Sequence, residues 1–414
     1  MFLEALRRRN PSFLQAAVDL HAQGSVPANS YVLDTDAVTA NARVLSQEAA
    51  RHSLTVFAMT KQAGRNPAFC AAVRSGGIEA AVAVDMADAR GVRMGGLRLG
   101  HLGHLVQVPE GEAGEAAAME PDFWTVFSRV KADEAAAATA AGGRVQDILL
   151  RIYAAGDTFY TGHEGGFGAD EVLDAAAYVD KLDGARFAGI TTFPALLFSE
   201  EDAVVAATHN LATLRQAAAR LREAGWSTEI NAPGTTSSVM LARLAEAGAT
   251  QVEPGHALTG STPLHAVRGD LPEIPAAAYL TEVSHLNGGR AYCFGGGLYI
   301  DPVFADYQVR ALVAPGGDLA EAFLADAEIP PPSAIDYYAM LTAPDGQTIR
   351  PGDTVLFGFR IQAFVTRAYV VPISGIGQSA PVAQGVWASD GRPALWPGNP
   401  GSSEHLTSTE RRPR

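Results

Sequence analysis

Only three lysines occur in the 414 residues, and one of them stands where chemistry is possible. Lys61 follows the apolar run TVFAMT and enters the glycine-containing loop QAGRNP, whereas Lys131 and Lys181 lie in polar, helix-like contexts. Burial at a strand end lowers the pKa of an ammonium group, and the free amine can then form a Schiff base with an aldehyde. Lys61 is therefore the candidate nucleophile; the plainer interpretation is a lysine that extends from a strand end into solvent.

Hydroxyl groups farther along the chain could bind an anion. The run NAPGTTSS places Thr235, Thr236 and Ser237 just before a helix-like segment. Hydroxyls and free backbone N–H groups at such a position can hold a phosphate, although an ordinary helix N-cap explains the same residues when they are taken alone.

A carboxylate ends the next apolar run, in VEPGHALTG. Glu253 is expected on the same side as the hydroxyl groups, and Gly255 and His256 add backbone N–H groups, although Glu-Pro-Gly is also common in ordinary turns. A lysine, a phosphate site and a carboxylate together match the three contacts of pyridoxal 5′-phosphate (PLP). These are a Schiff base with Lys61, a phosphate anchor and a partner for the ring nitrogen.

A scaffold must bring these distant strand ends together. Between residues 31 and 264 short apolar runs alternate with helix-like segments, which is typical of βα units and a parallel sheet. The runs span residues 55–60, 80–84, 97–101, 123–127, 147–153, 187–193, 227–231 and 251–253. Eight repeats predict an α/β fold with a closed (β/α)8 (TIM) barrel, whose active site lies at the carboxyl ends of its strands.

Helices are expected between these runs, among them 133–141 and 200–225, the second ending at Gly225. Before the first run, YVLDTDAVTANARVL predicts a short strand and then a helix that begins at Thr35 or Asp36.

A second domain follows the barrel. After His265 short β-like runs are separated by Gly and Pro, at 291–294, 297–300, 309–313, 354–359 and 364–371. The sequence therefore predicts four parts. They are an N-terminal helical extension (1–29), a PLP-binding barrel (30–265), a smaller, mostly β C-terminal domain (266–389) and a mobile tail (390–414).

Composition excludes several classes of function. Acidic residues outnumber basic ones by 45 to 31, which argues against a nucleic-acid partner. The longest uncharged stretch, 368–389, carries several Pro, Gly and Ser residues and is no membrane helix. With only Cys70 and Cys293, no disulfide framework is indicated, and a cytoplasmic location is expected.

The three motifs resemble those of the fold-type III PLP-dependent enzymes, the alanine racemase N-terminal-domain superfamily, and are most similar to its YhfX-like branch. The resemblance covers about residues 30–265 through MTKQAGRNP, NAPGTTSS and EPGHALTGSTPLHA. It implies that Lys61 holds the cofactor and that the hydroxyls of 235–237 bind the phosphate together with the amides of Gly255 and His256. It also implies that the second domain closes the site across a homodimer.

One departure concerns the ring nitrogen. Alanine racemases have Arg-Pro-Gly where this chain has Glu253, Pro254 and Gly255, and the glutamate resembles that of the basic amino-acid decarboxylases. A carboxylate favours a protonated ring nitrogen and a stronger electron sink. The loop GDTFYTGHEGGFG also lacks the arginine that racemases have near the ring hydroxyl. Alanine is therefore a doubtful substrate.

Racemisation needs a second acid/base opposite the lysine. In this family a tyrosine of the partner subunit supplies it in racemases, and a cysteine is used in decarboxylases. The run AYCFGGGLYIDP offers Tyr299 and Cys293, of which we favour Tyr299. D-Threonine aldolases of this fold bind a metal through a late histidine; the corresponding stretch FGFRIQAFVTR has none, so no metal is expected.

Other polar residues near strand ends have open roles. Arg65 could contact a carboxylate or phosphate, or cap a helix. Six histidines lie near strand ends: His101, His104, His163, His209, His256 and His265. His104 and His163 are candidates for stacking on the cofactor ring.

The sequence thus predicts a PLP-dependent enzyme that acts at Cα of a small-molecule substrate, an amino acid, with a racemase as the leading hypothesis. Lys61 would move the α-proton, and Glu253 would hold the ring nitrogen. Decarboxylation or aldol cleavage, a non-catalytic PLP carrier, and a phosphate-binding barrel without PLP are the alternatives.

Overall fold

Eight parallel strands close into a barrel in the computed structural model, which describes residues 1–299, 301–304 and 306–397. They are β2 (Thr55–Met59), β3 (Ala80–Ala83), β4 (Arg98–Leu102), β5 (Phe123–Val126), β6 (Gln146–Tyr153), β8 (Ala185–Thr191), β11 (Glu229–Asn231) and β12 (Gln251–Val252). Neighbours follow chain order, β12 pairs with β2, and β5 pairs with β6. Each of the eight predicted runs corresponds to one of these strands, so the predicted (β/α)8 barrel is confirmed.

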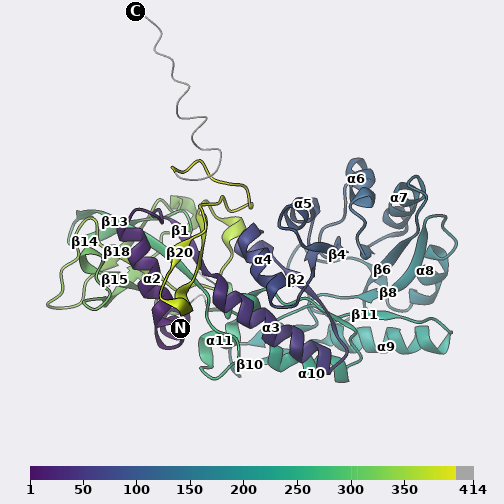
Figure 1. The fold of residues 1–414 in the computed structure, drawn as a ribbon. Helices are drawn as coiled ribbons and strands as arrows, with labels where there is room; N and C mark the ends of the chain where they lie inside the picture. Colours follow the sequence, from purple (N-terminus) through teal and green to yellow (C-terminus); the bar gives the residue numbers. More distant parts are fainter. Residues whose placement is uncertain (300, 305, 398–414) are drawn as a thin grey trace, which may run out of the picture.

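Helices pack around the barrel (Figure 1). They are α3 (Thr35–Arg51), α4 (Pro67–Ser75), α5 (Met86–Met94), α6 (Ala113–Ala118), α7 (Arg129–Ala140), α8 (Val172–Val179), α9 (His209–Glu223) and α10 (Leu241–Glu246). The helix expected at 133–141 begins earlier, at α7, because Ser128 caps it by accepting a hydrogen bond from the Lys131 amide.

The helix expected at 200–225 is shorter than predicted. Residues before His209 instead form a hairpin of β9 (Leu196–Ser199) and β10 (Val204–Ala207). Strand β10 begins with Val204 and Val205, and β-branched residues favour a strand. The end is as predicted, since Gly225 has φ +95° and its amide donates to the Arg222 carbonyl.

The second domain is an antiparallel sheet that closes on itself. Its ring consists of β13 (Ala277–Asn287), β14 (Arg290–Phe294), β17 (Tyr338–Thr342), β16 (Phe323–Glu328), β15 (Arg310–Ala314) and β18 (Thr354–Phe357). The predicted runs 291–294, 309–313 and 354–359 are strands here. The strand predicted at 297–300 is wrong for residues 297–299, which form no strand, and residue 300 lies outside the described residues. Run 364–371 becomes a strand only at β19 (Tyr369–Ser374).

The N-terminal segment joins this second sheet. Strand β1 (Ser30–Asp34), which the sequence assigned to the barrel, pairs antiparallel with β13 and parallel with β19. Asp34 then caps α3 by accepting from the Ala37 amide at 2.9 Å. Helices α1 (Phe2–Arg9) and α2 (Pro11–Ala22) pack on the sheet through Leu6, Phe13 and Leu14 (Figure 1). The predicted barrel domain, residues 30–265, therefore includes a strand of the C-terminal sheet.

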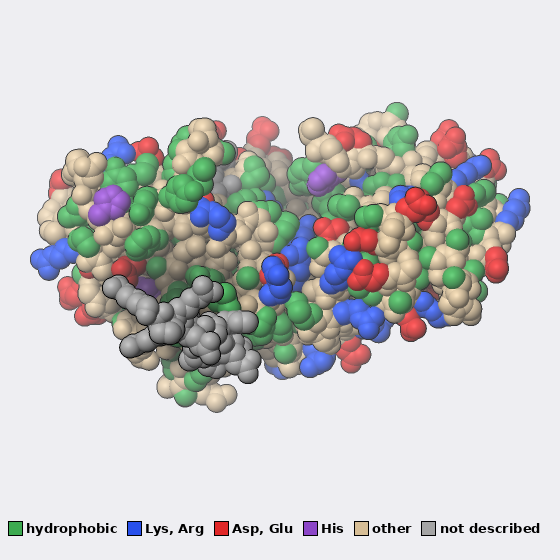
Figure 2. Space-filling view, turned by 90° about the horizontal axis from the view of Figure 1, so that it is seen from above, with side chains coloured by type: hydrophobic (Ala, Val, Ile, Leu, Met, Phe, Trp, Pro, Cys, Tyr) green, Lys and Arg blue, Asp and Glu red, His purple; other side chains and the backbone are tan. Residues whose placement is uncertain are grey.

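Two further predictions concern the tail and the cysteines. Residues 398–414 of the predicted mobile tail lie outside the described residues, whereas Trp387 and Pro393 form a β-bridge. Cys70 and Cys293 are both buried and free. Within the described ranges, no helix is long and apolar enough to cross a membrane. Acidic and basic side chains are interspersed over the barrel on the face shown in Figure 2.

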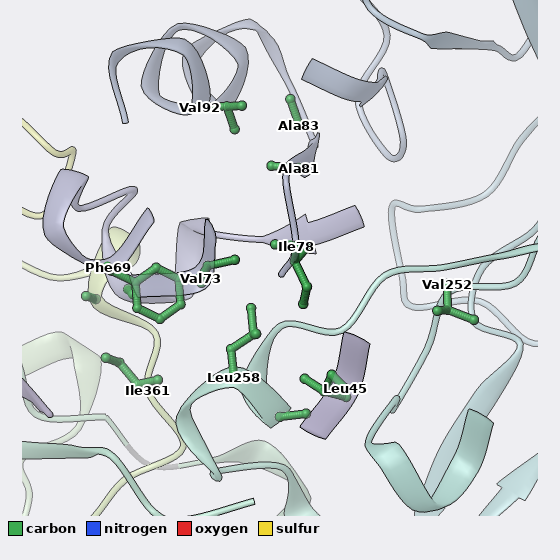
Figure 3. Close-up of a cluster of buried hydrophobic side chains, with 14 of the residues drawn as sticks. Leu45, Phe69, Val73, Ile78, Ala81, Ala83, Val92, Val252, Leu258 and Ile361 are labelled. Atoms are coloured by element: carbon green, nitrogen blue, oxygen red, sulfur yellow. The ribbon is translucent and has the colours of Figure 1, made fainter. Parts of the chain in front are cut away.

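One hydrophobic cluster connects the two domains. Phe69 and Val73 of α4, Ile78 and Leu258 belong to the barrel, and Ile361 comes from the C-terminal domain (Figure 3). Ile361 is completely buried there. Burial of this side chain fixes residues 360–364 across the mouth of the barrel, where the candidate site lies.

Candidate functional site

A cavity of about 270 Å³ lies at the carboxyl ends of the barrel strands. The predicted residues that line it are Lys61, Thr235, Thr236, Glu253, Gly255 and His256. Histidines 104 and 163 also line it, as do Arg360, Gln362 and Phe364 of the C-terminal domain. Barrel closure therefore brings together residues that are nearly 200 positions apart in sequence.

Lys61 presents a free amine to this cavity. It opens the 3₁₀ turn η1 (Lys61–Ala63), directly after β2, and is half-buried. Its Nζ lies 5.2 Å from the centre of the Phe364 ring, and no hydrogen-bond or ion-pair partner of Nζ occurs in the described part of the chain. Burial lowers the pKa of Lys61, and the charges of Asp88 and Asp85 oppose the shift only in part. The amine is thus available as a nucleophile or base.

Glu253 is held as a carboxylate on the other side of the cavity. Its Oε1 accepts hydrogen bonds from His101 Nδ1 at 2.5 Å and from Asn231 Nδ2 at 2.9 Å. Burial by itself would raise the pKa of Glu253, but His104, His101 and Asn231 outweigh it and lower the pKa. Its Oε2 is buried and accepts no hydrogen bond within the described residues, so it can take a donor from a ligand in the cavity.

Two histidines surround this carboxylate. His101 uses both ring nitrogens, since Nε2 lies 2.6 Å from Thr125 Oγ1. His104 Nδ1 lies 3.3 Å from Glu253 Oε2, and burial lowers the pKa of His104 to about 3, which keeps its ring neutral. The ligand atoms of His101, His104 and Glu253 lie within 4.8 Å of one another, a set that could hold a metal ion. The expectation of no metal therefore stays a prediction.

The anion site has free donors. Ser237 Oγ is buried and has no partner, and the backbone N–H groups of Thr236, Ser237 and Gly255 have no acceptor among the residues described. A side chain would not fit at Gly234, because its Cβ would lie 2.6 Å from the backbone of Leu196. This arrangement, a cradle of unpaired donors, could hold an anion such as a phosphate.

The ring of His256 is directed to the C-terminal domain. Its Nε2 lies 3.0 Å from the carbonyl oxygen of Ile361, so the ring connects the anion site to the C-terminal domain. Burial lowers the pKa of His256 well below its usual value, and the ring is neutral.

The C-terminal domain contributes alternate side chains of one short segment, which ends in the 3₁₀ turn η8 (Ala363–Val365). Arg360, Gln362 and Phe364 line the cavity, whereas Ile361 and Ala363 between them are buried. This alternation of period two was visible in FGFRIQAFVTR, where the sequence analysis considered only the missing histidine.

Asp301 and Tyr299 support this segment from behind. Asp301 Oδ1 accepts from Arg360 Nη2 at 2.9 Å, and the Tyr299 hydroxyl lies near the charges of Arg360 and Asp301. Burial raises the pKa of Tyr299. Tyr299 therefore lies next to a cavity residue without lining the cavity itself.

The matching family models cover most of the chain. Residues 33–263 match the alanine racemase N-terminal domain, and residues 278–383 match the YhfX-like C-terminal domain. The chain belongs to the YhfX-like branch of the fold-type III PLP-dependent enzymes. The uncharacterized protein YhfX of Escherichia coli is 39% identical over 394 residues, which cover 94% of this chain and 99% of that protein.

Solved structures of the superfamily share the fold. D-Threonine aldolase from Filomicrobium marinum has a TM-score of 0.66 at 18% identity, over 89% of this chain and 96% of the other. D-threo-3-Hydroxyaspartate dehydratase from Delftia sp. HT23 has a TM-score of 0.65 at 18% identity, over 88% of this chain and 98% of the other. Alanine racemase of Clostridium difficile 630 has a TM-score of 0.61 at 13% identity, over 88% of this chain and 99% of the other. These identities establish the fold and leave the reaction open.

Cofactor binding in this YhfX-like chain can be tested against its own residues. The groups that PLP needs are present in one cavity: a free amine, unpaired donors for a phosphate, and a buried carboxylate oxygen without a donor. The residues therefore fit the cofactor.

Cys293 does not fit the role considered for it. Its side chain is completely buried in the core of the C-terminal sheet, and Sγ lies 3.8 Å from the Ala339 carbonyl oxygen. Burial raises the pKa of this thiol to about 12. A side chain buried in this way cannot reach the cavity of its own protomer or that of a partner subunit. The assignment of Cys293 as the second acid/base is therefore wrong.

The structure also assigns partners to residues whose roles were open. Arg65 is buried and paired with Asp88, so its guanidinium is not in the cavity. His209 pairs with Asp157 at 2.8 Å on the outside.

One buried arginine was missed. Arg151, on β6, donates from Nη2 to the His163 carbonyl at 2.8 Å and stacks over the Phe127 ring. Burial lowers the pKa of Arg151 to about 10. The sequence analysis looked for an arginine in the loop after this strand, whereas the signal was a charged residue inside the apolar run ILLRIY.

Proposed function

We propose that this protein is a PLP-dependent enzyme acting at Cα of an amino acid, with racemisation as its leading reaction. The observation that carries the proposal is the buried Glu253 Oε2, which lacks a donor and shares one cavity with a free lysine amine. A buried oxygen of an ionised carboxylate that accepts no hydrogen bond is costly in a protein interior unless a ligand satisfies it.

Each residue then has a defined task. Lys61 would hold the cofactor and would accept or donate the proton at Cα. Glu253 would accept the hydrogen of the ring nitrogen, and Thr235, Thr236 and Ser237 would bind the phosphate. When bound, PLP supplies an electron sink that stabilises negative charge at Cα.

A racemase needs a second proton donor on the opposite face, and Tyr299 is our candidate. Its hydroxyl lies near the charge of Arg360, a residue that lines the cavity. We also propose a homodimer, in which the second domain of one protomer helps to close the site of the other. The two free, buried cysteines agree with the cytoplasm as the compartment.

Decarboxylation or aldol cleavage is the second candidate. The observation that favours it is Glu253 in place of an arginine, because a carboxylate favours a protonated ring nitrogen and hence a stronger electron sink. A PLP carrier is less well supported, since Arg360, Gln362 and Phe364 of the second domain line the cavity.

A first experiment tests the cofactor. Purified protein is incubated with PLP, its visible spectrum is recorded, and the adduct is reduced with borohydride and located by peptide mapping. We expect the label on Lys61. Lys131→Ala and Lys181→Ala are matched controls that should label normally. A colourless protein, or a label on either control lysine, refutes the proposal.

A second experiment separates the reactions. The PLP-loaded protein is incubated in D₂O with L- and D-amino acids, and deuterium at Cα is compared with released CO₂ and aldehyde. Deuterium in both enantiomers supports the racemase. Release of CO₂ or aldehyde without exchange of the recovered substrate supports the lyase and removes the racemase.

A further inference from the structure

Three buried polar side chains form a row behind the anion site. Thr262 Oγ1 lies 2.7 Å from His265 Nδ1, and His265 Nε2 lies 3.4 Å from Glu273 Oε2. Their exposed fractions are 2%, 1% and 0%. Thr262 also lines the cavity, next to the residues of the phosphate cradle. The row therefore runs from the protein interior to the place where an anion is expected.

Local structure explains why the first two side chains meet. Thr262 precedes the short helix α11 (Pro263–Val267), so Thr262 and His265 are three positions apart and lie on the same side of its first turn. The Thr262 side chain makes no capping hydrogen bond to this helix. Among the residues that the structure describes, its hydroxyl is therefore shared only between His265 and the cavity.

Glu273 is fixed from two further directions. Its Oε1 accepts from the Ser238 amide at 2.6 Å, directly after Ser237 of the cradle. Arg9 of α1 donates to the Glu273 carbonyl oxygen at 2.8 Å. One buried carboxylate thus supports both the cradle loop and, through His265, the Thr262 hydroxyl.

The hydrogens in this row follow from the acceptors. Burial would raise the pKa of Glu273, but the contacts with His265 and Ser238 outweigh it and lower the pKa. An ionised carboxylate only accepts, so a hydrogen on His265 Nε2 would face Glu273 Oε2, 3.4 Å away, and neither atom has a hydrogen-bond partner among the described residues. If Nδ1 is bare, Thr262 donates to it and offers the cavity only an oxygen. If Nδ1 also carries a hydrogen, Thr262 accepts from the ring and its own hydrogen is free.

An anion in the cradle selects the second arrangement, because a phosphate oxygen needs a donor. The charged and titratable groups around the ring are compatible with it. Glu273 contacts His265 directly, His256 is neutral, and Arg9 points to the backbone of Glu273.

We propose that Thr262 binds the phosphate of the cofactor and that His265 and Glu273 are positioning residues that keep its hydroxyl in the donating orientation. The inference rests on the proposed function for the identity of the anion. Inorganic phosphate, used as a second probe, tests the anion site independently of PLP.

The test measures the dissociation constants of PLP, pyridoxal and inorganic phosphate for the apo-protein. Wild-type protein is compared with Thr262→Val, Thr262→Ser, His265→Asn and Glu273→Gln. The control is Thr39→Val, a helix threonine whose hydroxyl donates to the Thr35 carbonyl. Thermal melting shows whether each variant is folded.

We expect Thr262→Val to weaken PLP and phosphate about tenfold to a hundredfold, the effect of losing a hydrogen bond to a charged group, and to leave pyridoxal unchanged. Thr262→Ser should restore most of the affinity, and the two positioning variants should lose part of it. Unchanged phosphate affinity in folded Thr262→Val overturns the inference, as does an equal loss for PLP and pyridoxal.

A spectroscopic readout separates positioning from simple structural support. In ¹⁵N spectra of the phosphate-bound protein, assigned with the His265→Asn variant, both ring nitrogens of His265 should carry hydrogen. A bare Nδ1 in that state contradicts the proposal. If wild-type protein binds phosphate but not PLP, the proposed function fails while the phosphate arm still decides the role of Thr262.

Discussion

A single methyl group at Gly234 should damage the anion site. The Cβ of Gly234→Ala would lie 2.6 Å from both the amide nitrogen and the carbonyl oxygen of Leu196. Those atoms belong to the backbone of β9, so no side chain can rotate away. The same carbonyl accepts a hydrogen bond from the Thr235 amide at 3.0 Å, and the methyl group would lie beside that bond.

The size of the effect follows from these distances. The loop must retreat by about 0.4 Å to reach the shortest tolerated contact and by about 0.8 Å to reach ordinary contact. Overpacking of this kind lowers the free energy of unfolding by about 1–3 kcal/mol. A comparable displacement of the cradle donors should raise the dissociation constant of PLP about tenfold to a hundredfold.

The assay combines thermal unfolding with PLP titration, and two variants calibrate it. Gly111→Ala is the control, because its Cβ would meet nothing within 4 Å. Gly255→Ala should have an intermediate effect, since its Cβ meets the end of the flexible Gln62 side chain. If Gly234→Ala binds PLP and melts like Gly111→Ala, the cradle is not where the structure puts it.

Other predictions follow from the same site. Glu253→Gln should still bind PLP but lower the rate of Cα exchange about 10²- to 10³-fold, because the charge that favours a protonated ring nitrogen is lost; an unchanged rate would show that this charge is not needed. Burial lowers the pKa of His104 to about 3. Between about pH 3 and 6.5 the His104 imidazole therefore binds a proton only in the unfolded chain. The free energy of unfolding then decreases by about 1.4 kcal/mol for each pH unit by which the pH is lowered. His104→Gln should flatten that slope in denaturant titrations, and a slope equal to that of the wild type would contradict the assignment. Cys293→Ala should leave Cα exchange in D₂O intact. Tyr299→Phe should slow reprotonation on one face, which is measured as unequal exchange of the two enantiomers. Equal exchange in Tyr299→Phe would remove Tyr299 from this role.

The sequence analysis was accurate where the signal is local. Eight apolar runs at regular spacing predicted the eight barrel strands, and the scarcity of lysine singled out Lys61. The rule that active sites lie at strand carboxyl ends then brought Thr235 and Glu253 together, as the cavity confirms. Each of these inferences needs only the periodicity of a short segment and one topological rule.

The analysis failed where long-range pairing decides the outcome. Strand β1 has the pattern of any buried strand, and nothing local states that its partners are β13 and β19. Cys293 was considered because decarboxylases of this family use a cysteine as the second acid/base, but sheet closure turns it into the core. Asn231 and His101 look like ordinary polar residues until the barrel brings both to the same carboxylate.

The amino-acid sequence by itself thus determined the barrel, the amine that can react and the loop that can hold an anion, because each depends on residue types within one short segment. Only the tertiary structure decided which oxygen of Glu253 remains without a donor, which side chains of residues 360–364 enter the cavity, and that Thr262, His265 and Glu273 form a row. The physical reason is that burial and hydrogen bonding are properties of packed neighbours, and these neighbours come from strands and loops far apart in the chain.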